Sequence, residues 1–298
     1  MTRDSLPADT GLTLHFRSGQ FNLASRTHVM GVLNVTPDSF SDGGRFDTPA
    51  RAIEHGLRMA EEGADFIDVG GESTRPKSQA YGEGGDPVGE EEELRRVLPV
   101  IEGLARRSPV PISIDTYRSR VAREALRAGA SIVNDISAFH FDPVMPAVVA
   151  EADAAAVLMH IRGTPKTMQS NPVYRDLWGE ILAYLQEGID RARASGVRQL
   201  LVDPGIGFGK TAQQNLRLIA ELRAMRSLGL PILVGPSRKS FIGEILGLPV
   251  AERLEGTLAA VVGAVLNGAH VVRVHDVREA VRAVRVADAL KSAPVAAH

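Results

Sequence analysis

The chain has 298 residues, of which 44% are hydrophobic and 23% are charged, so it is long enough to bury a large core. Its 34 Lys and Arg residues nearly balance 36 Asp and Glu residues, and this balance gives no global signal for binding to nucleic acid or to a membrane surface. The absence of cysteine excludes disulfide bonds, thiolate metal sites and a cysteine nucleophile. Because residues 1–10 are polar and no apolar run approaches the ~20 residues of a membrane span, we expect an untargeted cytoplasmic protein with no membrane partner.

Short apolar runs alternate with segments of helical periodicity along the chain, which is typical of buried parallel strands separated by helices. After a predicted β-hairpin at 12–16 and 21–23, the expected strands are 29–33, 66–69, 112–114, 132–133, 156–159, 200–202, 232–234 and 271–274. The expected helices are 50–62, 90–107, 119–128, 144–150, 178–195, 212–227, 252–266 and 277–290. Glycines just beyond several of these helices are typical helix C-caps.

Eight strand–helix units favour a (β/α)₈ TIM barrel, although a doubly wound sheet would also have glycines just beyond its helices. We expect one domain over 1–298, with the barrel at about 29–290 and the hairpin closing its bottom. The strand-to-helix connections 35–49 and 70–89 are longer than usual. Long connections on the catalytic rim of a barrel commonly contact substrate, and a disordered insertion is the alternative for 78–87.

Polar side chains follow nearly every predicted strand, where parallel strands deliver them to one rim. They are Asn34, Asp68, Asp115, Asn134, His160, Asp203, Arg273 and His275. This rim is therefore the predicted site of the chemistry. His160 has no evident partner in the sequence, and we interpret it, like Trp178, as structural.

Basic and hydroxyl side chains concentrate after the last two predicted strands. The sequence Ser-Arg-Lys-Ser occupies 237–240, and Arg273 and His275 follow on the next strand. Barrels frequently bind phosphate at this corner, so the pattern predicts a phosphorylated or pyrophosphorylated ligand. An isolated Ser-Arg-Lys-Ser run would otherwise be a solvated charge run.

Acceptor groups gather on the opposite strands, at Asp115, Asn134 and Asp203. Carboxylates and an amide suit a flat, nitrogen-rich heterocycle with N–H donors. Hydrogen bonding to nearby backbone, binding of a divalent metal and acid–base chemistry remain alternatives for these residues. The glycine-rich 203–210 fits neither a Walker nor a dinucleotide motif, and its Phe208 is either a stacking wall or core.

Six motifs in order resemble the dihydropteroate synthase family over about residues 29–286. They are NVTPDSFSDGG at 34–44, DVGGESTRP at 68–76, NDI at 134–136, DPGIGFGK at 203–210, SRKS at 237–240 and RVHD at 273–276. The resemblance implies condensation of 6-hydroxymethyl-7,8-dihydropterin pyrophosphate with p-aminobenzoate in folate biosynthesis, in an enzyme class that sulfonamides target.

The resemblance also implies roles for individual residues. The pterin would be bound by Asp115, Asn134, Asp203 and Lys239; the pyrophosphate by Asn34, Arg75, Arg273 and His275; and p-aminobenzoate by Phe40, Thr74, Pro76, Phe208 and Ser240. Asn34 would ligate Mg²⁺, and Asp42, Asp203 and Lys239 would be catalytic. A homodimer through 258–266 and 277–290 is implied as well. Lys77 stands where the family usually has glycine after the Arg-Pro pair.

The implied chemistry is dissociative: pyrophosphate leaves first, with help from Mg²⁺, and the aniline nitrogen attacks a pterin methylene cation. Two other functions share parts of the pattern. A pterin-binding methyltransferase would need the acidic trio but not the basic corner. A catalytically silent pterin carrier would have lost a residue of the rim, and none is missing.

Overall fold

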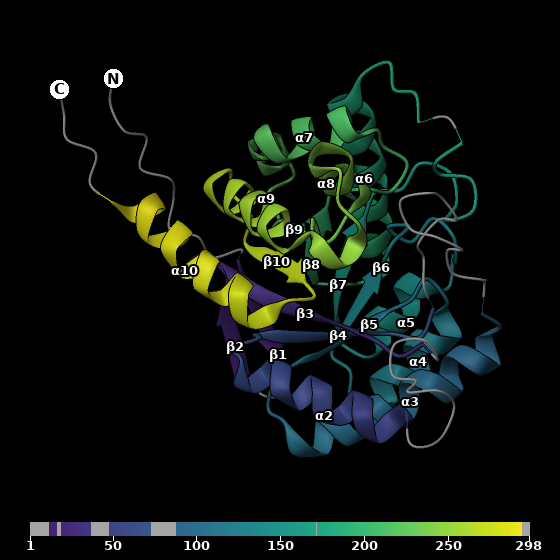
Figure 1. Cartoon of the computed structure of the whole chain (residues 1–298). Coiled ribbons are helices and arrows are strands. Elements are labelled where there is room, and N and C mark those ends of the chain that lie inside the picture. Colours follow the sequence, from purple (N-terminus) through teal and green to yellow (C-terminus); the bar gives the residue numbers. More distant parts are fainter. Residues whose placement is uncertain (1–11, 17–18, 37–47, 73–87, 171, 294–298) are drawn as a thin grey trace.

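The computed structural model describes residues 12–16, 19–36, 48–72, 88–170 and 172–293. Its centre is a sheet of parallel strands surrounded by helices (Figure 1). The strands are β3 (His28–Asn34), β4 (Phe66–Gly70), β5 (Ile112–Asp115), β6 (Ile132–Asp135), β7 (Ala155–Met159), β8 (Gln199–Asp203), β9 (Leu233–Val234) and β10 (Val271–Val274). All of the predicted strands are present, most of them one residue longer at an end.

The sheet closes on itself as a barrel. Its order is β8-β7-β6-β5-β4-β3-β10-β9, and the two edges meet through a parallel bridge between Val202 and Ile232. The Val202 N–H also donates to the Pro231 carbonyl at 2.9 Å. The TIM-barrel prediction is therefore confirmed over the doubly wound alternative.

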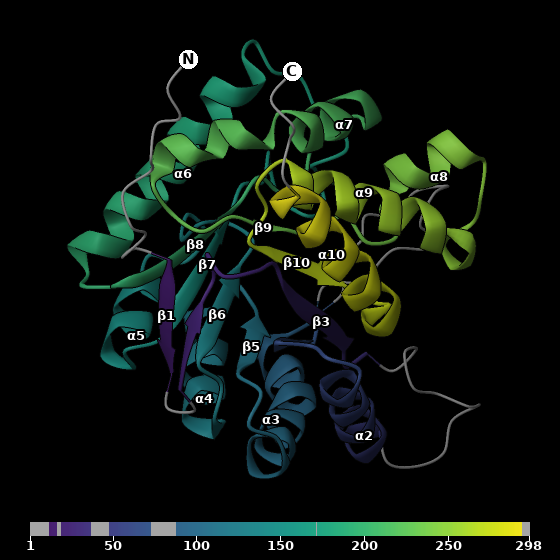
Figure 2. The ribbon, with the colours of Figure 1, turned by 90° about the vertical axis from the view of Figure 1, so that its left-hand side faces the viewer.

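Helices surround the strands of the barrel, as Figure 2 shows with the N-terminal hairpin of β1 (Thr13–Phe16) and β2 (Gly19–Asn22) in front. They are α2 (Thr48–Glu61), α3 (Glu90–Arg107), α4 (Ser119–Ala128), α5 (Met145–Glu151), α6 (Leu177–Ala194), α7 (Ala212–Ala220), α8 (Ser240–Leu246), α9 (Leu254–Leu266) and α10 (Val277–Ser292), with 3₁₀ turns η1 (Leu222–Leu228) and η2 (Val250–Glu252). No helix in these described ranges is both long and apolar enough to cross a membrane.

Two helix predictions differ from the structure. The expected helix 212–227 is α7 followed by the 3₁₀ segment η1, because apolar residues spaced three or four apart satisfy both helix types. The short helix α8, which directly follows the basic corner, was not predicted. It contains Gly243 and spans only seven residues, so neither propensity nor periodicity reveals it. The remaining helices begin and end within two residues of the prediction.

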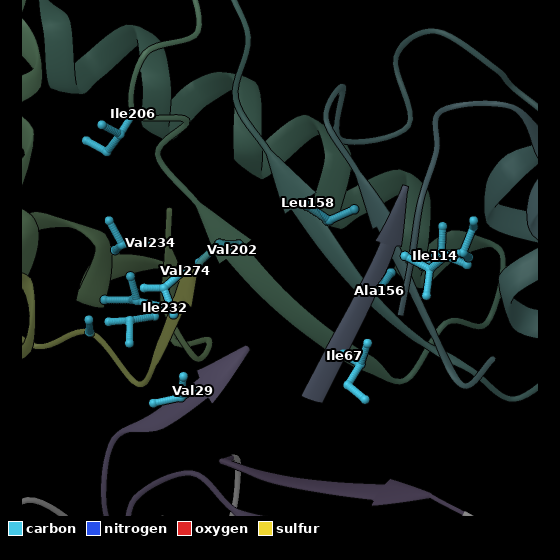
Figure 3. Packing of buried hydrophobic residues seen from close by; sticks show 14 of the residues in the cluster. Val29, Ile67, Ile114, Ala156, Leu158, Val202, Ile206, Ile232, Val234 and Val274 are labelled. Atoms are coloured by element: carbon cyan, nitrogen blue, oxygen red, sulfur yellow. The ribbon is translucent and has the colours of Figure 1, made fainter. Parts of the chain in front are cut away.

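The core has two layers. Between strands and helices lies a continuous apolar layer, to which Val29, Ile67 and Ile114 belong (Figure 3). Inside the barrel, a smaller cluster joins Met30 and Phe66 to Leu14 of the β1–β2 hairpin. This contact closes the end of the barrel at which the strands begin, as predicted, and leaves the opposite end open for a site.

Candidate active site

A cavity opens at the carboxyl ends of the strands. Side chains from most strands and from the connections after them line it, which follows from parallel strands ending at one rim. The lining residues are Val32, Asn34, Glu72, Asp115, Asn134, Ile136, Met159, Met168, Asp203, Ile206, Gly207, Phe208, Gly235, Ser237, Arg238, Lys239, Val250, Arg273 and His275. The rim predicted from the sequence is therefore a real concave site.

The acidic side of the cavity is formed by the ends of β5, β6 and β8. Asn134 and Asp203 are each 5% exposed, and Asp115 stands beside them on the cavity wall. One oxygen of Asp203 accepts a hydrogen bond from the Gly205 N–H at 2.7 Å. Burial raises the pKa of Asp203 to about 6, against the opposing effects of the Gly205 hydrogen bond and nearby cations. This wall therefore offers the Asn134 amide and carboxylate acceptors to a ligand.

The Arg273 guanidinium donates hydrogen bonds to two carboxylates. Its Nε donates to Asp68 at 2.5 Å, and its Nη2 donates to Asp115 at 2.7 Å. Asp68 is fully buried, and the same oxygen accepts a hydrogen bond from Asn134 Nδ2 at 2.9 Å. Burial raises the pKa of Asp115, while the Arg273 guanidinium lowers it. Arg273 thus sits between the acidic residues, although sequence reasoning assigned it to the pyrophosphate side.

The basic corner is built by the segment after β9 and by the end of β10. The Lys239 ammonium lies 4.2 Å from the centroid of the Phe208 ring, a cation–π distance that places both side chains on one wall. Ser237 Oγ lies 3.0 Å from His275 Nδ1 and also accepts the His275 backbone N–H at 3.2 Å. Arg238 pairs with Asp276, with Nε 3.1 Å from Oδ2.

The structure brings together most of the predicted residues that it describes. Asn34, Asp115, Asn134, Asp203, Phe208, Lys239, Arg273 and His275 all line the same cavity. Ser240 is the first residue of α8 and is not among the lining residues. Phe40, Asp42, Thr74, Arg75 and Pro76 lie outside the described residues.

Two buried charged residues beside the cavity were given no individual role by the sequence. Asp68 ends an apolar run, so its position at a strand end was visible, but nothing indicated that it anchors Arg273 and Asn134. Lys210 closes the glycine-rich segment, and its side chain is 3% exposed. The interpretation of His160 as structural agrees with its burial, and its partner is Lys210, with 2.9 Å between Nδ1 and Nζ.

Comparisons with known proteins agree with one another. The model of the pterin-binding enzyme family matches residues 30–275, which include every candidate site residue. Dihydropteroate synthase of Synechocystis is 49% identical over 287 residues, or 95% of each chain, and that of Escherichia coli is 48% identical over 271 residues, or 90% of this chain and 93% of its own. The chain belongs to the dihydropteroate synthase family.

Solved structures of this family share the fold. The Xanthomonas albilineans dihydropteroate synthase with 4-aminobenzoic acid has a TM-score of 0.87 at 43% identity, covering 96% of this chain and all of its own. The same enzyme in complex with 7,8-dihydropteroate has a TM-score of 0.81 at 42% identity, covering 92% and 97%. A Yersinia pestis dihydropteroate synthase in complex with a sulfonamide drug has a TM-score of 0.86 at 44% identity, covering 94% and 100%. Dihydropteroate synthase, rather than a methyltransferase or a carrier, is thus the class to which this enzyme belongs.

Proposed function

We propose that this dihydropteroate synthase joins 6-hydroxymethyl-7,8-dihydropterin pyrophosphate to p-aminobenzoate, forming 7,8-dihydropteroate and pyrophosphate. One observation carries the proposal: a single cavity has an acidic wall at Asp115, Asn134 and Asp203 and a basic corner at Lys239 and His275. The acidic wall suits the N–H donors of a pterin, and the basic corner suits the charge of a pyrophosphate.

The pterin ring is proposed to lie against the acidic wall. Its amino and ring N–H groups would donate to the Asp115 and Asp203 carboxylates, and Asn134 supplies an acceptor whose orientation is fixed by its bond to Asp68. Met159 and Ile206 line the same cavity and provide apolar surface for the flat ring. Phe208 would flank p-aminobenzoate at the mouth, where sulfonamides would compete with it.

The pyrophosphate is proposed to lie between Asn34, Arg273 and His275. Guanidinium has five N–H donors, and its bonds to Asp68 and Asp115 use two of them, so Arg273 can hold the acidic wall and still face a phosphate. His275 receives support from Ser237, which contacts both its ring and its backbone. The proposed roles of Arg75, Asp42, Phe40, Thr74 and Pro76 rest on the resemblance alone.

A magnesium ion is proposed to bind at Asn34. This half-buried amide ends β3 and offers a hard oxygen, the donor type that Mg²⁺ prefers, and Mg²⁺ commonly completes its shell with water and substrate phosphate oxygens. No cluster of three or more His, Asp or Glu side chains suited to a metal occurs among the residues that the structure describes. When bound, the ion would neutralise charge on the departing pyrophosphate.

The proposed substitution is dissociative. The bond from the pterin methylene carbon to the pyrophosphate oxygen breaks, and the electron pair leaves with pyrophosphate toward Lys239 and His275. The Asp203 carboxylate stabilises the methylene cation that remains. The p-aminobenzoate nitrogen then forms the new bond and gives up one proton to solvent. No side chain needs to act as a nucleophile in this route.

The enzyme is proposed to be a cytoplasmic homodimer. Its cysteine-free sequence needs no oxidising compartment. Large apolar side chains stand exposed on the adjacent helices α9 and α10, at Leu266, Val286 and Leu290, the last two about 60% exposed. We expect sedimentation to give about twice the chain mass of 31.9 kDa and Val286→Glu to lower it. A wild-type mass of one chain would contradict this proposal.

Pterin affinity should depend on pH. Burial raises the pKa of Asp203 to about 6, so its carboxyl is largely protonated at pH 5 and ionised at pH 7. Since only the ionised form accepts hydrogen bonds from the pterin through both oxygens, we expect the affinity for a pterin ligand to rise between pH 5 and pH 7. Calorimetric titrations across this range would measure it, and a constant affinity would argue against the acidic wall as the pterin site.

Product analysis tests the function. Purified protein would be incubated with dihydropterin pyrophosphate, p-aminobenzoate and Mg²⁺, and dihydropteroate would be sought by mass spectrometry. We expect product, and its loss on chelation and return with added Mg²⁺ would support the metal. Absence of product with pterin still bound would instead favour methyl transfer, which a parallel incubation with methyltetrahydrofolate and a corrinoid acceptor would detect.

A further inference from the structure

Lys210 is a cation buried behind the wall of the site. It follows the glycine-rich turn 203–209, is 3% exposed and does not line the cavity. Its Nζ lies 2.9 Å from the Gly205 carbonyl oxygen, 3.0 Å from the Phe208 carbonyl oxygen and 2.9 Å from His160 Nδ1. Lysine is almost never buried to this extent unless it is paired, so the burial of Lys210 depends on these three contacts.

The three contacts match the chemistry of an ammonium group. Two carbonyl oxygens can only accept, and a protonated lysine has three donors, so His160 Nδ1 completes the set as the third acceptor. His160 is then neutral, with its proton on Nε2. Burial lowers the pKa of His160, which also favours the neutral imidazole. Burial lowers the pKa of Lys210 well below its usual range, but the Asp203 carboxylate opposes this shift, and the three acceptors around Nζ favour the charged form.

The carbonyl groups that Lys210 holds belong to the turn that presents two site residues. Gly205 follows Asp203 and donates its N–H to that carboxylate, and the Phe208 N–H donates to the Gly205 carbonyl at 3.0 Å. Gly205 has a φ of +72°, and a Cβ there would collide with the carbonyl oxygen of His160. The turn therefore packs directly on the end of β7. The His160 N–H also donates to the Asp203 carbonyl at 3.0 Å, which links the two segments.

We propose that Lys210 is a positioning residue for the condensation: its ammonium, oriented by neutral His160, fixes the 205–208 turn and so sets the Asp203 carboxylate and the Phe208 ring in the cavity. The inference rests on the proposed function, which gives those two groups their ligands. Lys210 touches neither substrate. It acts through the backbone carbonyls: without it the Phe208 carbonyl loses its lysine donor, and the Gly205 carbonyl keeps only the Phe208 N–H.

The positive charge adds a second effect. Lys239, Lys210 and Arg273 each lower the pKa of Asp203 against the dominant effect of burial, while Arg162 and Lys239 face Lys210 from neighbouring segments. Removing the Lys210 charge therefore moves the ionisation of Asp203 to higher pH. A role confined to holding the fold would leave this ionisation unchanged, which makes it the distinguishing readout.

Lys210→Met tests the proposal because methionine keeps most of the length and volume but has no donor. We expect the Kd for a pterin ligand to increase at least tenfold, kcat/KM to fall by a similar factor, and the pH midpoint of pterin binding to move upward. Lys291→Met removes an exposed lysine from the last turn of α10 and should leave all three unchanged. Thermal unfolding of each variant establishes that it is folded.

A pair of substitutions at His160 provides independent evidence. Asparagine can place its side-chain oxygen near the position of Nδ1, so His160→Asn should keep most of the pterin affinity, whereas His160→Leu should lose at least tenfold. If the Lys210→Met variant does not fold, the comparison of His160→Asn with His160→Leu tests the proposal instead. Wild-type protein that forms no product would count against the proposed function itself. An active wild type whose Lys210→Met or His160→Leu form binds pterin with unchanged affinity and pH midpoint would overturn only the positioning role.

Discussion

Lys239→Ala is expected to lower kcat/KM for dihydropterin pyrophosphate by about 100-fold or more, the scale of losing one preorganised charged donor in an enzyme site. Lys239 is a cation of the basic corner and lines the cavity, with its ammonium 4.2 Å from the centroid of the Phe208 ring. It lowers the pKa values of both Asp203 and Asp115, so its loss leaves the acidic wall with less counter-charge. The departing pyrophosphate loses a cation at the same time.

Steady-state kinetics with both substrates would measure this effect. Lys239→Arg keeps the charge but changes its shape, so we expect it to retain more activity than the alanine variant. Lys291→Ala, on the exposed end of α10, serves as the matched control and should behave as the wild type. Wild-type activity in Lys239→Ala would remove Lys239 from the catalytic site.

Asp203→Asn is expected to weaken pterin binding by about 10- to 100-fold, since a hydrogen bond to a charged group contributes about 1.5–3 kcal/mol. The substitution keeps the shape of the side chain and an oxygen that can accept the Gly205 N–H. It removes the negative charge and replaces one acceptor with a donor, which would face a pterin N–H. The wall would therefore repel the ring that it is proposed to bind.

Calorimetry can separate the two halves of the site. We expect pyrophosphate alone to bind the Asp203→Asn variant about as well as it binds the wild type, because the basic corner is built by other elements. Asp190→Asn, an exposed carboxylate on α6, controls for the loss of one charge. If the Asp203→Asn variant bound a pterin ligand with undiminished affinity, the assignment of Asp203 would be wrong.

The sequence predicted the barrel and its rim because both depend on local patterns. Apolar runs such as 29–33 and 271–274 mark buried strands, and the residues after them reach one face by topology alone. This reasoning predicts that Asp115, Asn134, Asp203 and His275 meet at one rim, and in the structure all four line one cavity.

Other features depend on contacts between distant segments. Asp68 meets Arg273 across 205 positions of sequence, and Lys210 meets His160 across 50, so no periodicity or motif spacing connects either pair. The sequence pattern assigned Arg273 to the basic corner by its neighbours, but the pattern could not show that its guanidinium also pairs with the Asp68 and Asp115 carboxylates. The helix α8 was missed for a local reason, namely its short length and internal glycine.

A crystal structure with dihydropterin pyrophosphate bound would test whether the cavity is divided into a pterin half and a pyrophosphate half. We predict that the pterin ring hydrogen-bonds to Asp115, Asn134 and Asp203 and that the pyrophosphate faces Asn34 and His275. A pyrophosphate bound against the acidic wall, or a pterin bound outside this cavity, would contradict this division.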